Sequence, residues 1–92
     1  MILEIVTPEA TLLHSEVDLV AVPGVNGEFQ MLNNHAPIVS LLVEGNVRFK
    51  GSDVKIEEQF ASKFTNNKGE YLLPIKSGTI EMKANKVIVL AD

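Results

Sequence analysis

The stretch Val17-Asp18-Leu19-Val20-Ala21-Val22-Pro23-Gly24 decides the fold of this chain. Its first six residues are mostly apolar and β-branched, which is typical of a β-strand. The pair Pro23-Gly24 ends the run, because both residues favour turns over regular structure. The pair Asn26-Gly27 favours positive φ and a tight turn. The chain is therefore predicted to reverse direction directly after this strand.

Other short apolar runs, separated by Gly, Pro and Asn, repeat this pattern. They occupy residues 2–6, 38–43, 47–50, 71–75, 79–83 and 87–90. Short strands with frequent turn residues are typical of a β-sandwich or barrel, so the predicted fold class is all-β. Pro74 has no N–H for a sheet ladder, which places its strand at an edge or at a bulge. Residues 87–90 are expected to form a buried closing strand after a turn at Ala84-Asn85.

Residues 51–69 interrupt the strand pattern. Ile56, Phe60 and Phe64 are spaced by four, which would place them on one face of a helix. Val54 and Ile56 could instead extend the preceding strand. A helix this short is marginal without packing. We expect a variable connection with about one helical turn, whose phenylalanines cap the sandwich.

The composition restricts the class of protein. A chain of 92 residues makes one small domain, and its 46% of hydrophobic residues must supply the core. The sequence has no cysteine, which excludes disulfides and thiolate chemistry. The N-terminus lacks a basic region, and no apolar run approaches about 18 residues, so neither a signal peptide nor insertion into the membrane is expected.

The net charge of −4 is unevenly distributed, because all eight basic residues lie at or after Arg48. The acidic residues before Arg48 are Glu4, Glu9, Glu16, Asp18, Glu28 and Glu44. An acidic chain without a basic stripe is a poor ligand for nucleic acid. The acidic half would favour a basic partner, unless the folded strands interleave so that no acidic face exists.

No group of residues in the sequence points to catalysis. The two histidines, His14 and His35, lack the further ligands of a zinc site, and His14 is expected at the surface or at a sheet edge near a bend. None of the serines lies in a Gly-x-Ser-x-Gly motif. Glu57 and Glu58 are neighbours whose side chains point apart. There is also no glycine-rich phosphate loop, so we expect no catalytic, cofactor-binding or metal-binding residues.

The stretch from Gly27 to Pro37 carries one carboxylate, Glu28, and one imidazole, His35. After Glu28, residues 29–32 are expected to form a short extended piece. Asn33-Asn34 tolerates the left-handed region, and Pro37 fixes its own φ while keeping the preceding alanine extended. A loop ordered in advance loses little entropy on binding. The stretch is therefore either a stiff contact surface for another protein or simply a well-formed turn.

Together with the rest of the chain, this loop resembles the epsilon subunit of the F-type ATP synthase. The resemblance covers about residues 1–50 and 70–92 and depends on the order and spacing of several short motifs. They are Leu3-Glu4-Ile5-Val6-Thr7-Pro8-Glu9, Val20-Ala21-Val22-Pro23-Gly24, Gly27-Glu28-Phe29, His35-Ala36-Pro37-Ile38, Gly45-Asn46-Val47, Ser77-Gly78 and Asn85-Lys86-Val87-Ile88-Val89-Leu90-Ala91-Asp92.

The resemblance implies a flattened sandwich of two five-stranded sheets in a non-catalytic subunit of the central stalk. Such a subunit grips the gamma subunit, rests on the c-subunit ring and rotates with both, peripherally at the cytoplasmic face of the bacterial plasma membrane. It couples proton flow to ATP synthesis in the catalytic head. By position, the residues that would face the c ring are Glu28, Phe29, Asn33, Asn34, His35, Ala36 and Pro37. Ring loops in this family commonly carry an arginine, so Glu28 is expected to be an electrostatic contact.

The sequence departs from the family pattern at Gln30, Asn33-Asn34 and Thr79, where many members have Gly, Pro-Gly and Gly. Most members also continue past the equivalent of Leu-Ala-Asp into a two-helix hairpin. Because this sequence stops at Asp92, we expect no inhibitory hairpin and no nucleotide binding. Two competing hypotheses are a free-standing β-sandwich that binds another protein through residues 27–37, and a small metal-dependent enzyme that uses His14 and His35.

Overall fold

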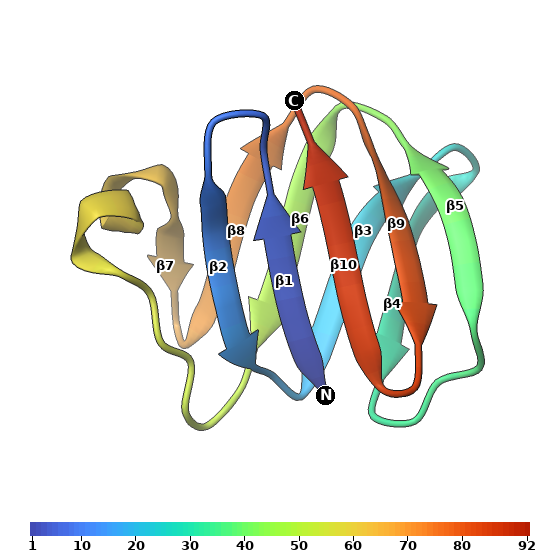
Figure 1. Cartoon of the computed structure of the whole chain (residues 1–92), viewed down its shortest axis with the longest axis horizontal. Coiled ribbons are helices and arrows are strands. Elements are labelled where there is room, and N and C mark those ends of the chain that lie inside the picture. The colour runs from blue at the N-terminus through green and yellow to red at the C-terminus, as the bar shows by residue number, and fades with distance from the viewer.

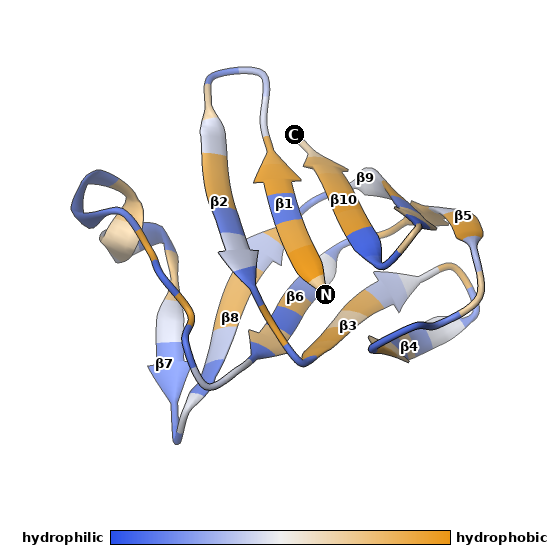
Figure 2. Cartoon of the chain, turned by 60° about the horizontal axis from the view of Figure 1, so that its bottom comes forward, coloured by the Kyte–Doolittle hydropathy of each residue, from blue (hydrophilic) through white to orange (hydrophobic).

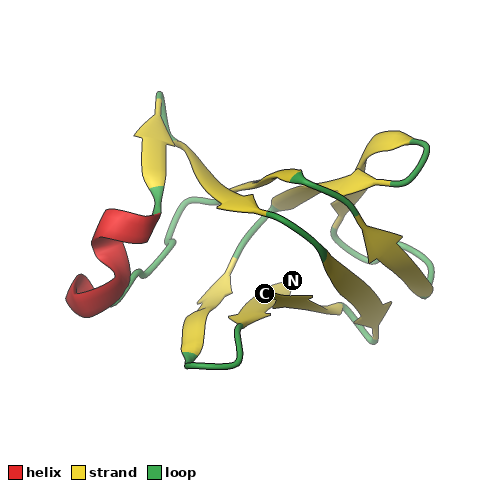
Figure 3. Cartoon of the chain, turned by 90° about the horizontal axis from the view of Figure 1, so that it is seen from above, coloured by secondary structure: helices red, strands yellow, loops and turns green.

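The computed structural model describes residues 1–92, and β-strands make up most of it. The strands form one hydrogen-bonded array that curls into two layers (Figures 1 and 3). The first sheet contains, in spatial order, β2 (Thr11–Glu16), β1 (Ile2–Val6), β10 (Lys86–Ala91), β9 (Gly78–Lys83) and β5 (Ile38–Leu42). The second sheet contains β4 (Gly27–Leu32), β3 (Leu19–Gly24), β6 (Gly45–Lys50), β8 (Glu70–Ile75) and β7 (Thr65–Asn67).

The two sheets meet at one corner, where Gly24 of β3 pairs with Leu42 of β5. The predicted all-β sandwich of two five-stranded sheets is thus confirmed, with the addition that this corner joins the sheets. The first and last strands, β1 and β10, lie side by side as a parallel pair from Ile2 opposite Lys86 to Val6 opposite Leu90 (Figure 1). Both ends of the sequence therefore contribute to the middle of the same sheet.

The core lies between the two sheets and follows the period-two alternation of the strands. Leu3 and Ile5 of β1 and Val87 and Val89 of β10 are fully buried. Hydrophobic residues predominate along β1, β10 and β5, whereas β7 is hydrophilic (Figure 2). Aliphatic side chains thus supply most of the core.

One aromatic cluster adds to this aliphatic core. The ring of Phe49, which is fully buried, stacks on Tyr71 at a centroid distance of 5.5 Å. The edge of Phe64 meets the same ring at 5.7 Å. Such ring pairs stabilise a core beyond the area that they bury. Phe49 therefore connects the core to the segment that contains Phe64.

Residues 51–69 contain a short helix where about one turn was expected, and the six residues of this helix make about two 3-10 turns. A 3-10 helix, η1 (Glu58–Lys63), precedes β7, and Phe60 and Phe64 are half-buried against the core. Val54 and Ile56 do not extend a strand. Their segment lies along the outer edge of β2, because the N–H of Lys55 donates to Ser15 Oγ at 3.0 Å. No helix in the structure is long and apolar enough to span a membrane.

The prediction for Pro74 is confirmed and that for the last strand is wrong in part. β7 pairs with β8 only at Glu70–Leu72, so Pro74 lies on a locally free edge. In β10, Val87 and Val89 are buried, but the side chain of Leu90 is 51% exposed. Successive side chains of a strand point to opposite faces, and the outer face of this sheet is uncovered. β10 is therefore buried on one face only.

The turns follow local sequence chemistry closely. Gly24 pairs with Gly27 across a two-residue turn, and the φ of Gly27 is 113°. Ala84 and Asn85, with φ values of 52° and 59°, form the two-residue turn between β9 and β10. Asn34 also adopts the left-handed region, with φ of 63°. The predicted turn at Ala84-Asn85 is confirmed. The turn predicted at Asn26-Gly27 lies one residue earlier, at Val25-Asn26, and of the predicted pair only Gly27 has positive φ.

Candidate functional site

The stretch from Gly27 to Pro37 divides into a strand and a loop. Residues Gly27–Leu32 form β4, and residues 33–37 connect β4 to β5. A strand advances about 3.4 Å per residue, so Glu28 lies at one end of β4 and the loop at the other. Figure 1 shows the two ends at opposite sides of the molecule. The expectation of a single loop tip that includes Glu28 is therefore wrong, because residues 27–32 pair with β3 along their whole length.

Glu28 is engaged within the chain. Its Oε1 accepts a hydrogen bond from Arg48 Nη2 at 2.6 Å, and its Oε2 accepts one from Arg48 Nε at 3.0 Å. Arg48 Nη1 donates to Glu70 Oε2 at 2.7 Å. The hydrogen bond from Arg48 lowers the pKa of the Glu28 carboxyl below its usual value. The carboxylate that was expected to bind a basic group of another protein thus already binds Arg48 of its own chain.

Phe29 packs against the core of the domain. Its side chain is half-buried, whereas the next residue, Gln30, is exposed. The remaining residues predicted for the contact do lie together at the surface. All five positions of the loop are exposed: Asn33, Asn34, His35, Ala36 and Pro37. The structure thus brings together five of the predicted contact residues and separates Glu28 and Phe29 from them.

Hydrogen bonds hold the exposed loop from several sides. Asn33 Oδ1 accepts from the amino group of Met1 at 2.5 Å. The N–H of Asn34 donates to Asn85 Oδ1 at 2.8 Å. The N–H of His35 donates to the carbonyl of Leu32 at 3.2 Å. The loop is therefore both accessible and fixed, which is the arrangement suited to rigid contact with a partner.

A second exposed surface was not located from the sequence. On the outer face of the first sheet, Val39, Leu41 and Leu90 are 75%, 65% and 51% exposed, and Val43, just beyond the end of β5, is 42% exposed. Leu41 and Leu90 are both paired in register with Thr79, from either side of β9. We call these four residues the outer apolar face. Exposed apolar patches on small proteins commonly mark interaction surfaces.

One signal in the sequence could have indicated this face. Residues 38–43 contain Ser40 and otherwise only apolar residues. They therefore lack the alternation of a strand that has one wet face. Such a run is typical of a strand covered on both sides, but here one side has no cover within the chain. The sequence could not show which neighbouring strands complete the face.

Charged residues from the two halves of the sequence pair with one another. Besides the Arg48–Glu28 pair, Lys86 Nζ lies 3.7 Å from Glu4 Oε1, between β10 and β1. Pairing of this kind supports the alternative that the strands interleave the charges. The acidic first half is thus partly neutralised by basic residues of the second half.

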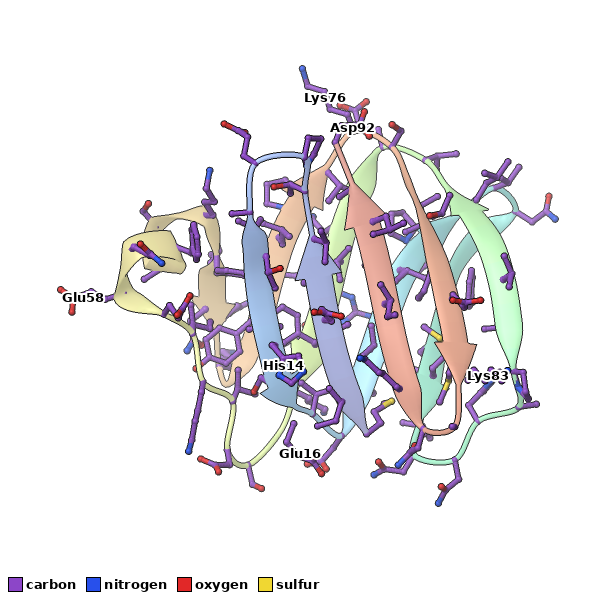
Figure 4. All side chains as sticks on the ribbon, in the orientation of Figure 1. His14, Glu16, Glu58, Lys76, Lys83 and Asp92 are labelled. Atoms are coloured by element: carbon purple, nitrogen blue, oxygen red, sulfur yellow. The ribbon has the colours of Figure 1, made fainter.

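Among the remaining candidates for chemistry, His14 and Glu57 line one open cleft beside β2, and the others lie elsewhere. His14 is exposed in the middle of the edge strand β2 and not at a bend, and Glu58 lies at the far end of the molecule on η1 (Figure 4). No group of three or more His, Asp or Glu side chains is placed to hold a metal ion. One cleft, of about 600 Å³, lies between Leu12, Phe60 and Ile75. Its lining includes Ser62 but no histidine.

Comparison with known proteins gives consistent results. The sequence matches the family described as "ATP synthase, Delta/Epsilon chain, beta-sandwich domain" over residues 1–92. The ATP synthase epsilon chain of Maridesulfovibrio salexigens is 37% identical over 92 residues, which are 100% of this chain and 54% of that relative. The ATP synthase epsilon chain of Chlorobaculum tepidum is 34% identical over 90 residues, which are 98% of this chain and 86% of that relative.

A solved structure shares the fold at low sequence identity. A chain in the central stalk/c-ring structure of the Tetrahymena thermophila mitochondrial ATP synthase superposes with a TM-score of 0.72 and 14% identity. The alignment covers 99% of this chain and 62% of that one. The chain spans about half the length of the Maridesulfovibrio relative. Because the family match extends over all 92 residues, this chain belongs to the family of the ATP synthase delta/epsilon chain beta-sandwich domain.

Proposed function

We propose that the chain is a non-catalytic central-stalk subunit of a proton-translocating ATP synthase. It would couple rotation of the c ring, through the gamma subunit, to ATP synthesis in the catalytic head. Its place would be peripheral, at the cytoplasmic face of the membrane. The observation that carries this proposal is the pair of separate exposed surfaces: the outer apolar face and the fixed polar loop at residues 33–37.

The outer apolar face is the proposed contact with gamma. Val39 and Leu41 are 75% and 65% exposed on a regular sheet, where a partner could cover them without any rearrangement. Burying a leucine or valine side chain fully contributes about 1.5–3 kcal/mol. A few such residues can therefore support a stable interface.

The loop at residues 33–37 is the proposed contact with the c ring. Its asparagines and His35 offer hydrogen-bonding groups to polar loops of the ring, and Pro37 limits its flexibility. In this proposal, Glu28 and Phe29 hold in place the strand that leads into the loop. Phe29 fixes β4 on the core, and Glu28 fixes it to Arg48. The loop at the end of β4 then keeps a defined position.

Two variants of Leu41 test the contact with gamma. Leu41→Ser removes apolar surface, whereas Leu41→Met keeps it at similar volume. We expect the serine variant to weaken co-purification with gamma at least tenfold, and the methionine variant to retain it. Urea unfolding should give similar stability for both, because the side chain is 65% exposed. Equal binding of gamma by both variants would contradict the assignment of this face.

The combined change His35→Ala and Pro37→Ala tests the contact with the ring. Docking onto the membrane sector should weaken, while binding of gamma and the folded β-sandwich persist. The alternative of a free-standing binding module would be favoured by a different result. In that case the double variant would still bind gamma and the membrane sector normally, but would lose binding to a different protein that the unchanged loop captures.

A further inference from the structure

We propose that Asn85, in the turn between β9 and β10, is a positioning residue for the loop at residues 33–37. The inference rests on the proposed function of that loop as the contact with the c ring. The turn and the loop are far apart in the sequence but adjacent in space, and Lys83 at the start of the turn lies at the same end of the molecule as the loop (Figure 4). Asn85 Oδ1 accepts a hydrogen bond from the N–H of Asn34 at 2.8 Å.

This bond acts on the backbone of the loop. Asn34 has φ of 63°, a conformation that only a few residue types adopt readily. Its N–H lies directly before His35, so holding it fixes the direction in which the chain presents the imidazole. A hydrogen bond to a side chain elsewhere in the loop would leave the backbone free to move. The bond from Asn34 therefore sets the path of the contact surface.

Asn85 is itself fixed to the first sheet. Its carbonyl accepts a hydrogen bond from the N–H of Ile2 at 3.1 Å. The residues on either side of the turn, Lys83 and Lys86, are paired in register. One residue thus joins the start of β1 through its backbone and the loop through its side chain. The position of the loop is therefore fixed by a contact with the first sheet as well as by the two strands that the loop connects.

Two substitutions separate the side-chain bond from the turn. Asn85→Gly keeps the left-handed turn, because glycine adopts positive φ without penalty, and removes the acceptor. Asn85→Asp keeps an acceptor oxygen at the same place and also tolerates positive φ. A matched control is Asn66→Gly, because Asn66 Oδ1 accepts from the N–H of Gly69 at 3.1 Å in the remote turn between β7 and β8.

The experiment measures amide hydrogen exchange in the full chain and docking onto the membrane sector in the assembled complex. We expect Asn85→Gly to raise exchange at Asn34 by roughly twofold to tenfold, the range for loss of one hydrogen bond. Docking should weaken by a similar factor, with unchanged thermal stability. Asn85→Asp should restore both, and Asn66→Gly should alter exchange only at Gly69.

The outcomes distinguish this inference from the proposed function. Unchanged exchange at Asn34 in Asn85→Gly would overturn the positioning role. Faster exchange with normal docking would also overturn it, provided that His35→Ala still weakens docking. If His35→Ala docks normally as well, the proposed contact between the loop and the ring is wrong.

Discussion

The guanidinium of Arg48 reaches across β3 to bind the carboxylate of Glu28 through two hydrogen bonds, at 2.6 and 3.0 Å. Ala21 of β3 is paired with Arg48 in register and has no exposed surface. A small residue at this position leaves room for the long side chain to cross the strand. On its other side Arg48 binds Glu70, so one arginine connects β4, β6 and β8.

Glu28→Gln should reduce stability at neutral pH and leave it unchanged in acid. The pKa of Glu28 is lowered in the folded state by the hydrogen bond from Arg48, so its contribution is present above the ordinary value of 4.5. The contribution is lost as the pH falls through the lower folded pKa. Because Glu28 is 48% exposed, we expect only about 0.5 kcal/mol at pH ~7.

Urea unfolding at pH ~7 and at pH ~2 measures this difference, with the exposed Glu44→Gln as control. If Glu28→Gln is still less stable than the unchanged chain at acid pH, the ion pair is not the source of the lost stability.

Ala84→Gly should stabilise the chain. Ala84 has φ of 52°, where an L-residue with a Cβ loses about 1–2 kcal/mol and glycine does not. The greater entropy of glycine in the unfolded chain offsets part of this gain. We expect a net increase of about 0.5–1 kcal/mol in the free energy of unfolding. Ala10→Gly, at a residue without positive φ, should instead lower stability slightly.

Gly78→Ala should destabilise the chain more than Gly69→Ala. A Cβ on Gly78 would collide with the carbonyl oxygen of Leu90 on the neighbouring strand, so β9 and β10 would have to move apart. At Gly69 a Cβ would meet nothing, and only the φ of +85° opposes it. We expect the free energy of unfolding to fall by about 2–3 kcal/mol in Gly78→Ala and by about 1 kcal/mol in Gly69→Ala. Urea midpoints compare the two variants, and an equal or reversed order would contradict the close approach of β9 and β10.

Phe49→Ala and Phe64→Ala test how the segment at residues 51–69 is attached. Phe49 is fully buried at the centre of the aromatic cluster, so its loss should cost about 3–5 kcal/mol. Phe64 is half-buried, and we expect a smaller loss of about 1–2 kcal/mol. Hydrogen exchange should then rise first in β7, with little change in β1. Uniform exchange throughout the chain would show that this segment is not a separate local unit.

Much of the fold could be predicted from the sequence, because strands and turns depend on local chemistry. The turn before β4 depends on Gly27 and the turn before β10 on Asn85, because glycine and asparagine both tolerate positive φ. In β4, Glu28 and Gln30 alternate with Phe29 and Met31, a period-two pattern that indicates a strand. The extended piece predicted at residues 29–32 is therefore confirmed as part of β4, but the length of this strand separates Glu28 from the loop.

The contacts between distant strands could not be predicted in this way. The bond between Asn34 and Asn85 joins positions 51 residues apart. The exposure of Leu90 depends on which face of β10 meets the second sheet. Glu28 could be identified as a charged residue, but its partner Arg48 depends on the order β4-β3-β6 and on the small side chain of Ala21. Such relationships arise from topology and not from the local sequence.

The strand β5 begins directly after Pro37 and carries Val39 and Leu41. The proposed contact loop therefore leads directly into the strand that carries two residues of the outer apolar face, and this strand is hydrogen-bonded to β9 along its length. A force applied at the loop would reach the outer apolar face as axial load on a paired strand, without crossing a linker. The two proposed contacts are then joined through a hydrogen-bonded sheet and not through a flexible linker.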